Sequence, residues 1–124
     1  MTFHEWVEKW QIGPGMNDGH IINSELYSGF DGTVGEGWVL ILDRLAADLV
    51  AMGWDRNLMQ VKEKFGELRF SIGSGTDKMF ERIDQAEEES ANTCEQCGQP
   101  GVTRPGGWLL TLCDACDAKR NGMR

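Results

Sequence analysis

Four cysteines in two identically spaced pairs constrain this chain more than any other feature of its sequence. Cys94 and Cys97 form the first pair, Cys113 and Cys116 form the second, and the 124 residues contain no other cysteine. The spacing C-x2-C-x15-C-x2-C is typical of a zinc site, because each pair can place two thiolates on one tetrahedral ion. The sequence therefore predicts one Zn²⁺ bound by Cys94, Cys97, Cys113 and Cys116.

The expected role of this zinc is structural. Four thiolate ligands leave no open position for water, which a catalytic zinc needs. A redox role for a C-x-x-C pair would normally accompany a βαβ pattern, and this sequence has none. A DNA-reading finger is also disfavoured, because residues 94–124 hold three acids against four bases before the negative zinc-thiolate centre is counted.

The charge and hydropathy of the chain restrict its partners and its compartment. The formal net charge is −8, and residues 1–60 hold nine acids against three bases. Because Lys and Arg contacts to phosphate dominate nucleic-acid affinity, so acidic a chain is a poor general binder of nucleic acid. No apolar run approaches the roughly 20 residues that span a bilayer, and the N-terminus lacks a secretory signal pattern. We expect a cytoplasmic protein without membrane contact, in which paired cysteines favour metal over disulfides.

Three segments carry apolar residues at helical spacing: 2–10, 37–52 and 76–91. Thr2 and Glu5 form a potential capping box, Thr76 is an N-cap candidate, and Gly53 stands where a left-handed C-cap is expected. The buried stripes are predicted to be Phe3, Trp6, Val7 and Trp10; Trp38, Ile41, Leu42, Leu45, Leu49 and Met52; and Met79, Phe80, Ile83, Ala86 and Ser90. Glu87, Glu88 and Glu89 are expected to face solvent.

Residues 58–72 alternate in the manner of a β-hairpin. The alternation places Val61, Phe65 and the apolar residues of 68–72 on one face, with Lys62, Lys64 and Arg69 on the other. Glu63 falls on the apolar face, so it lies near an edge or a bulge shifts the register. The glycine-rich stretch 11–37 forbids a long helix, and short strands are expected at 20–23 and 26–27.

The cysteine segment completes the predicted architecture. A zinc knuckle at 94–98, a turn at 105–107, a β-rich run at 108–112 and a helix over 113–119 indicate a treble-clef-like module, with a zinc ribbon as the alternative. We therefore expect an α+β fold in which two main helices pack on a small antiparallel sheet. Residues 1–93 form the core, and residues 94–124 form the four-cysteine module that packs on it.

No catalytic set emerges from the sequence. The only histidines, His4 and His20, lie far upstream of the cysteines in unrelated contexts. The glycine-rich stretches match neither a phosphate loop nor a dinucleotide fingerprint. The sequence thus predicts no catalytic residue, and we expect the protein not to be an enzyme.

The three cations of the hairpin are the most distinctive feature outside the cysteines. Lys62, Lys64 and Arg69 form a local basic patch on an acidic protein. Three interpretations stay open: a solvated sheet face, a contact surface for an anionic partner, or an internal tie to the acidic helix at 76–91.

Two of these segments together carry a resemblance. The run QVKEKFGELRF at 60–70, an acidic helix, C-x-x-C-G and GWLLTLC at 107–113 are similar to small zinc-binding proteins of bacterial and bacteriophage genomes. The resemblance covers residues 36–116 and implies no particular reaction. It adds one expectation, since small acidic phage proteins often bind and inhibit host proteins.

The sequence thus favours a non-enzymatic, zinc-stabilised protein-binding factor, with a phage-encoded modulator or inhibitor of a host complex as its specific form. Such a host complex could itself handle nucleic acid. The alternative is a nucleic-acid-binding or transcription-related accessory factor that uses Lys62, Lys64, Arg69 and the basic tail 119–124.

Overall fold

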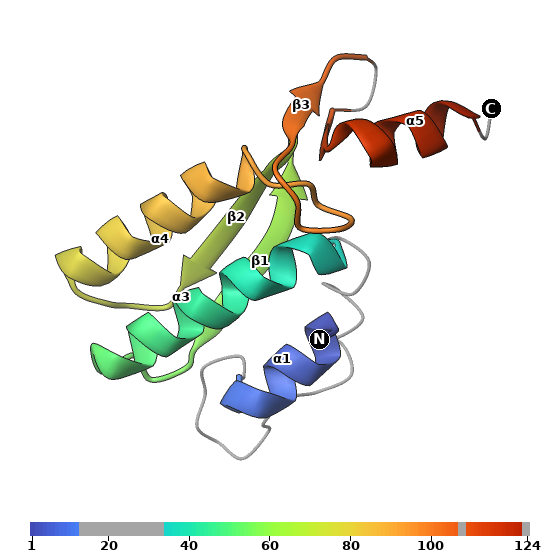
Figure 1. Ribbon diagram of the computed structural model, residues 1–124. Helices are drawn as coiled ribbons and strands as arrows, with labels where there is room; N and C mark the ends of the chain where they lie inside the picture. Colours follow the sequence, from blue (N-terminus) through green and yellow to red (C-terminus); the bar gives the residue numbers. More distant parts are fainter. Residues whose placement is uncertain (13–33, 107–108, 123–124) are drawn as a thin grey trace.

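The computed structural model of the chain describes residues 1–12, 34–106 and 109–122. In this part, helices lie on one side of a β-hairpin, and the cysteine segment sits at one end of the helices (Figure 1). The strands expected at 20–23 and 26–27, and His20, lie outside the described residues. The described elements confirm the predicted α+β class.

Helix α1 (Phe3–Trp10) begins with the predicted capping box. The Thr2 hydroxyl accepts from the Glu5 backbone N–H over 3.1 Å, and the Glu5 carboxylate accepts from the Thr2 N–H over 2.8 Å. The two bonds satisfy amide donors that the first helical turn cannot pair internally.

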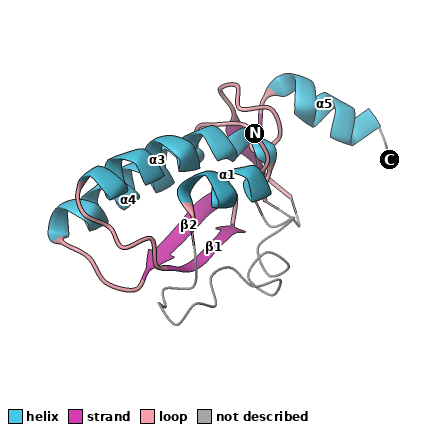
Figure 2. Cartoon of the chain, turned by 90° about the horizontal axis from the view of Figure 1, so that it is seen from below, coloured by secondary structure: helices cyan, strands magenta, loops and turns pink. Residues whose placement is uncertain are grey.

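Two longer helices form the main layer over the hairpin. A short 3-10 turn η1 (Glu36–Trp38) leads into α3 (Val39–Ala51), and Gly53 follows with a φ of 101°, as the C-cap prediction requires. Helix α4 (Asp77–Ser90) is capped by the Thr76 hydroxyl, which accepts from the Met79 N–H over 3.2 Å. Figure 2 shows α1, α3 and α4 on the same side of the sheet.

The predicted hairpin consists of β1 (Leu58–Lys64) and β2 (Glu67–Ile72), paired antiparallel. The only register shift lies between Leu58 and Gln60, so no bulge accounts for Glu63. Glu63 instead lies one residue from the end of β1, and its carboxylate accepts from the Gly66 N–H in the turn over 2.7 Å. The edge interpretation of Glu63 is therefore confirmed.

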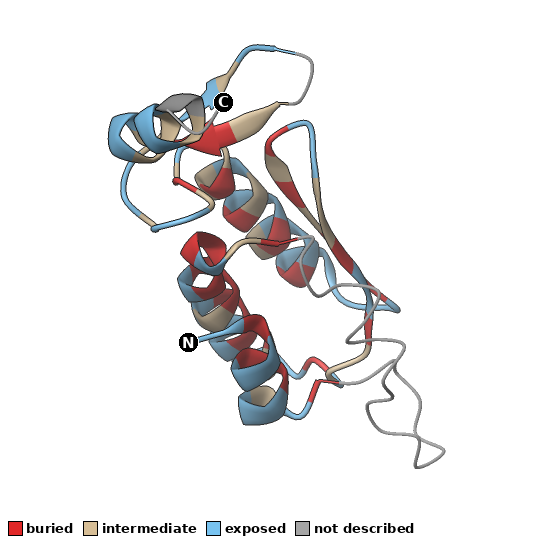
Figure 3. Ribbon diagram, turned by 90° about the vertical axis from the view of Figure 1, so that its right-hand side faces the viewer, coloured by how far each residue is buried: buried red, intermediate tan, exposed pale blue. Residues whose placement is uncertain are grey.

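The core lies between the hairpin and the helices, where buried residues face inward (Figure 3). Trp6 and Trp38 are fully buried, and Phe70 on β2 contacts Trp6 edge-on with ring centroids 6.4 Å apart. The predicted helix stripes account for about half of the described core.

The predicted burial of three side chains is wrong. Phe65, Phe80 and Met52 are 65%, 44% and 41% exposed. Phe65 and Gly66 form the two-residue turn, with φ values of 55° and 81°, so Phe65 leaves the strand alternation altogether. Phe80 and Met52 lie at the margins of their helical stripes, where a side chain reaches solvent.

The outer edge of β2 is closed by side chains of α4. The Leu68 N–H donates to the Ser90 hydroxyl over 2.8 Å, and the Phe70 N–H donates to the Glu87 carboxylate over 3.0 Å. Glu87 was expected to face solvent with its neighbours, and that prediction is wrong. A strand edge needs acceptors for its outward N–H groups, and the helix supplies them.

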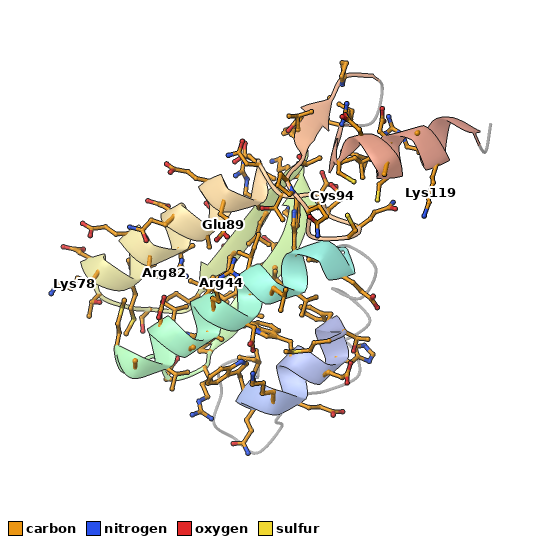
Figure 4. The ribbon with its side chains drawn as sticks, viewed as in Figure 1. Arg44, Lys78, Arg82, Glu89, Cys94 and Lys119 are labelled. Atoms are coloured by element: carbon orange, nitrogen blue, oxygen red, sulfur yellow. The ribbon has the colours of Figure 1, made fainter. Side chains whose placement is uncertain are left out.

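Ion pairs connect the helices to one another. Arg82 of α4 pairs with Asp48 of α3 over 2.6 Å, and Arg44 of α3 pairs with Glu89 of α4 (Figure 4). Lys62 and Lys64 make no ion pair within the described part of the chain. The interpretation of the basic patch as an internal tie to α4 is therefore wrong for both lysines.

Among the described residues, no helix is both long and apolar enough to cross a membrane.

Candidate metal centre

The cysteine segment follows directly from α4 and contains three parts. A tight turn at 94–98 carries the first pair, β3 (Val102–Arg104) and β4 (Leu110–Leu112) form a short antiparallel hairpin, and α5 (Asp114–Gly122) follows. Cys113 lies between β4 and α5, and Cys116 lies in the first turn of α5. This order of knuckle, hairpin and helix is that of the predicted treble-clef-like module.

The four cysteine sulfurs converge. The Sγ atoms of Cys94, Cys97, Cys113 and Cys116 all lie within 4.8 Å of one another, and those of Cys97 and Cys113 are 3.6 Å apart. Around a tetrahedral zinc with Zn–S bonds of about 2.3 Å, the sulfurs would be about 3.8 Å apart. The donor set and its spacing therefore fit one metal ion, and this cluster could hold it.

The burial of the cluster is graded from the core outward. Cys94 is fully buried, Cys113 and Cys116 are half-buried, and Cys97 is exposed. One side of the cluster thus joins the core, and the other reaches solvent. An ion bound here would be fixed to the fold through Cys94.

The electrostatics of the thiols suit a cation. Burial alone would raise the pKa of Cys94, but the backbone N–H groups of Cys113, Cys97 and Gln96 donate to its sulfur and lower that pKa to about 6. Hydrogen bonding with Cys113 raises the pKa of Cys116 to about 12. Clustered thiols cannot all ionise without a neutralising charge, which a divalent ion provides.

The knuckle packs closely on the start of the α3 region. The Gly37 N–H donates to the Glu95 carbonyl over 3.0 Å, and the indole N–H of Trp38 donates to the Thr93 carbonyl over 2.9 Å. A Cβ on Gly37 would lie 2.6 Å from the Gly98 nitrogen and would overlap the Cys94 carbonyl oxygen. Only a glycine permits this approach.

Glu95 joins the two halves of the module. Its N–H donates to the Thr111 carbonyl over 2.9 Å, and its carboxylate accepts from the Thr111 N–H over 3.0 Å. Thr111 precedes the second cysteine pair by two residues. This reciprocal pair therefore aligns the strand that carries Cys113 with the knuckle that carries Cys94.

Arg104 ties β3 to the start of α5. Its guanidinium donates to the Leu112 carbonyl over 2.9 Å and to the Asp114 carboxylate over 2.8 Å. Asp114 begins the helix that holds Cys116, so this contact supports the orientation of the second pair.

The predicted site residues divide into two groups. The structure brings the four cysteines together, whereas Lys62, Lys64 and Arg69 lie on the β1–β2 hairpin and are not part of that cluster. Lys62 and Arg69 are register partners, and Arg69 also pairs with Glu67 over 3.4 Å. His4 on α1 is not part of the metal cluster.

Sequence reasoning missed Gly37, Glu95, Thr111 and Gly66 as supports of the site. The sequence assigns Trp38 to the buried stripe of 37–52 and residues 60–70 to the hairpin, without linking either segment to the cysteines. Nothing in their local spacing signals that they meet at the cysteine module, because these contacts join residues far apart in the chain.

The comparisons with known proteins add no relative: no protein-family model matches the chain, and no curated protein and no solved structure shows significant similarity to it.

Proposed function

We propose that the protein binds one structural Zn²⁺ and uses the hairpin beside the metal module to bind an acidic surface of another protein. The observation that carries the zinc assignment is the set of four sulfurs within 4.8 Å. All four tetrahedral positions are filled by thiolates, which favours a structural ion over a catalytic one.

The hairpin surface consists of Lys62, Lys64, Phe65 and Arg69. The Lys64 ammonium lies 5.6 Å from the centroid of the Phe65 ring, and that ring is 65% exposed. An exposed aromatic side chain beside a lysine ammonium fits a partner surface with an apolar pocket and a carboxylate rim. On a chain of net charge −8, this local reversal of sign favours binding through the hairpin.

The backbone of Phe65 supports the same assignment. Two-residue hairpin turns of this kind favour Asn-Gly, because both residues adopt positive φ. Phe65 adopts a φ of 55° there, and a bulky side chain in that region is strained. Strain at an exposed aromatic residue that contributes little to the core is typical of a binding contact.

Metal analysis tests the zinc. Reduced, purified protein should contain one zinc per chain, and Cys94→Ser should abolish stoichiometric binding. Protein that carries no zinc after refolding with excess Zn²⁺ would contradict the assignment.

Affinity capture with two charge-matched variants tests the surface. Lys62→Glu/Lys64→Glu removes the hairpin lysines. Lys78→Glu/Lys119→Glu makes the same charge change on α4 and α5, away from the hairpin (Figure 4). From nuclease-treated bacterial lysate, the wild type and the second variant should retain a near-stoichiometric protein partner, and the first should lose it.

Two results would oppose the proposal. Equal capture by both variants would remove the hairpin surface from the interaction. Binding of oligonucleotides by the wild type, weakened in both variants and by salt, would favour the nucleic-acid alternative.

A further inference from the structure

The tip of the β1–β2 hairpin is held by the metal module. The Thr111 hydroxyl donates to the Gly66 carbonyl over 2.6 Å, and it also lies 2.9 Å from the Thr103 hydroxyl. Gly66 is buried although it occupies a turn. A Cβ on Gly66 would lie 3.1 Å from both threonine side chains, so the turn and the module are in direct contact.

The same threonine is anchored to the knuckle. Thr111 exchanges two hydrogen bonds with Glu95, one through the Glu95 backbone and one through its carboxylate. Glu95 follows Cys94, and Thr111 lies two residues before Cys113. An ion that joins the two cysteine pairs therefore also fixes Glu95 and Thr111 relative to each other.

These contacts form one continuous path from the cysteines to Phe65. We infer that metal binding at the four cysteines orders the hairpin tip through Glu95, Thr111 and Gly66, so that the tip presents Phe65 and Lys64 only in the metal-loaded protein. Partner binding is then conditional on the metal. This inference rests on the proposed function for its biological meaning, although the coupling itself involves no partner.

The coupling has a reciprocal consequence. If metal binding stabilises the tip by a given factor, an intact tip must strengthen metal binding by the same factor. A single buried hydrogen bond contributes about 1 kcal/mol, which corresponds to roughly fivefold in an equilibrium constant. The two effects can therefore be measured independently and compared.

Thr111→Val is the decisive variant, because it removes the hydroxyl and leaves the four cysteines and the backbone bonds to Glu95. The matched control is Thr93→Val. Thr93 also precedes the knuckle, but its hydroxyl donates to the Glu89 carbonyl at the end of α4 over 2.8 Å. Both variants are measured with zinc bound, by amide hydrogen exchange and by zinc competition with a chromophoric chelator.

In Thr111→Val the Gly66 amide should exchange about fivefold faster than in the wild type, and zinc affinity should fall by a similar factor. Thr93→Val should leave Gly66 exchange unchanged. Faster Gly66 exchange with unchanged zinc affinity, or equal behaviour of the two variants, would overturn the coupling.

The partner experiment separates this inference from the proposed function. Suppose that Thr111→Val shows the coupled changes, but Lys62→Glu/Lys64→Glu captures the partner as well as the wild type does. That combination would support the coupling and reject the hairpin as the docking surface. Hairpin-dependent capture that is as strong with Thr111→Val as with Thr93→Val would keep the surface and reject its control by the metal.

Discussion

The indole of Trp38 donates its N–H to the carbonyl of Thr93 across a sequence separation of 55 residues. Trp38 is fully buried at the start of the main core helix, and Thr93 immediately precedes Cys94, the first cysteine of the cluster. The Trp38 side chain therefore packs in the hydrophobic core and also bonds to the residue that leads into the cysteine module.

Trp38→Phe should weaken folding and metal binding together. It removes the hydrogen bond to the partly buried Thr93 carbonyl, and a bond of this kind contributes about 1 kcal/mol. Urea unfolding and zinc competition measure the two effects. Trp10→Phe is the control, because the Trp10 indole bonds to Asp43 on α3, over 2.8 Å. A loss of zinc affinity in Trp10→Phe as large as in Trp38→Phe would contradict a specific link.

Gly37→Ala should separate the module from the core. The new methyl group would overlap the Cys94 carbonyl, and relief requires the knuckle to move, at a cost of about 1–3 kcal/mol or more. Gly53→Ala has open space around its Cβ but a φ of 101°, so it reports backbone strain alone. Unfolding free energy and zinc affinity should both fall in Gly37→Ala, whereas only the former should fall in Gly53→Ala.

Phe65→Asn should stabilise the fold and abolish partner binding. Asn tolerates positive φ better than Phe, so relief of strain should raise the unfolding free energy by about 0.5–1 kcal/mol. Thermal unfolding and capture experiments test the two opposite effects. Phe80→Asn, at an exposed aromatic position on α4, should lower stability slightly and leave capture intact. Loss of stability in Phe65→Asn would show that the ring supports the fold.

Ionisation of Glu87 should lower the free energy of unfolding as pH rises. Burial raises the pKa of Glu87 above its usual value of 4.5, despite the Phe70 N–H and the nearby Arg69. The native state then holds a proton that the unfolded chain releases, between pH 4.5 and the higher native pKa. Glu87→Gln keeps an acceptor for Phe70 and removes the titration. Its stability relative to wild type should therefore increase across that window; a constant difference would contradict the raised pKa.

Zinc binding should release protons and weaken on acidification. In the metal-free protein at about pH 8, Cys94 with its pKa of about 6 is a thiolate, whereas Cys116 with its pKa of about 12 is a thiol. Metal binding must displace the proton from Cys116. Calorimetry in two buffers of different ionisation enthalpy should detect this release. Affinity should fall further below about pH 6, as Cys94 becomes protonated. Binding without proton release would contradict this account.

The elements of the fold were largely predictable because periodicity is local. The apolar stripe predicts helix α3, and the apolar alternation predicts strands β1 and β2. Each pattern marks the residues that the element buries. The errors arise where contacts between segments distant in the chain decide whether a side chain is buried. Alternation alone did not show that Phe65 belongs to the turn, and nothing near Glu87 in the sequence shows that the Phe70 N–H would need its carboxylate.

The convergence of the four cysteines was predictable, but the residues that support the cluster were not. The spacing of the two pairs predicts that their sulfurs can meet around one tetrahedral ion, and the four sulfurs do lie within 4.8 Å of one another. Gly37, Glu95 and Thr111 act through contacts with residues distant in the chain, and their residue types are unremarkable at their own positions. Such relationships exist only once the module has packed on the core.

The contact of Gly37 and Trp38 with the knuckle also bears on the order in which the chain acquires structure. Local helices and the β1–β2 hairpin can form early. The contact between Gly37, Trp38 and the knuckle closes a long loop, and loop closure slows the contacts that depend on it. During synthesis from the N-terminus, the buried face at the start of α3 stays uncovered until residues 93–98 emerge. The fully buried Trp38, whose indole bonds to Thr93, therefore lacks this cover until that point of synthesis.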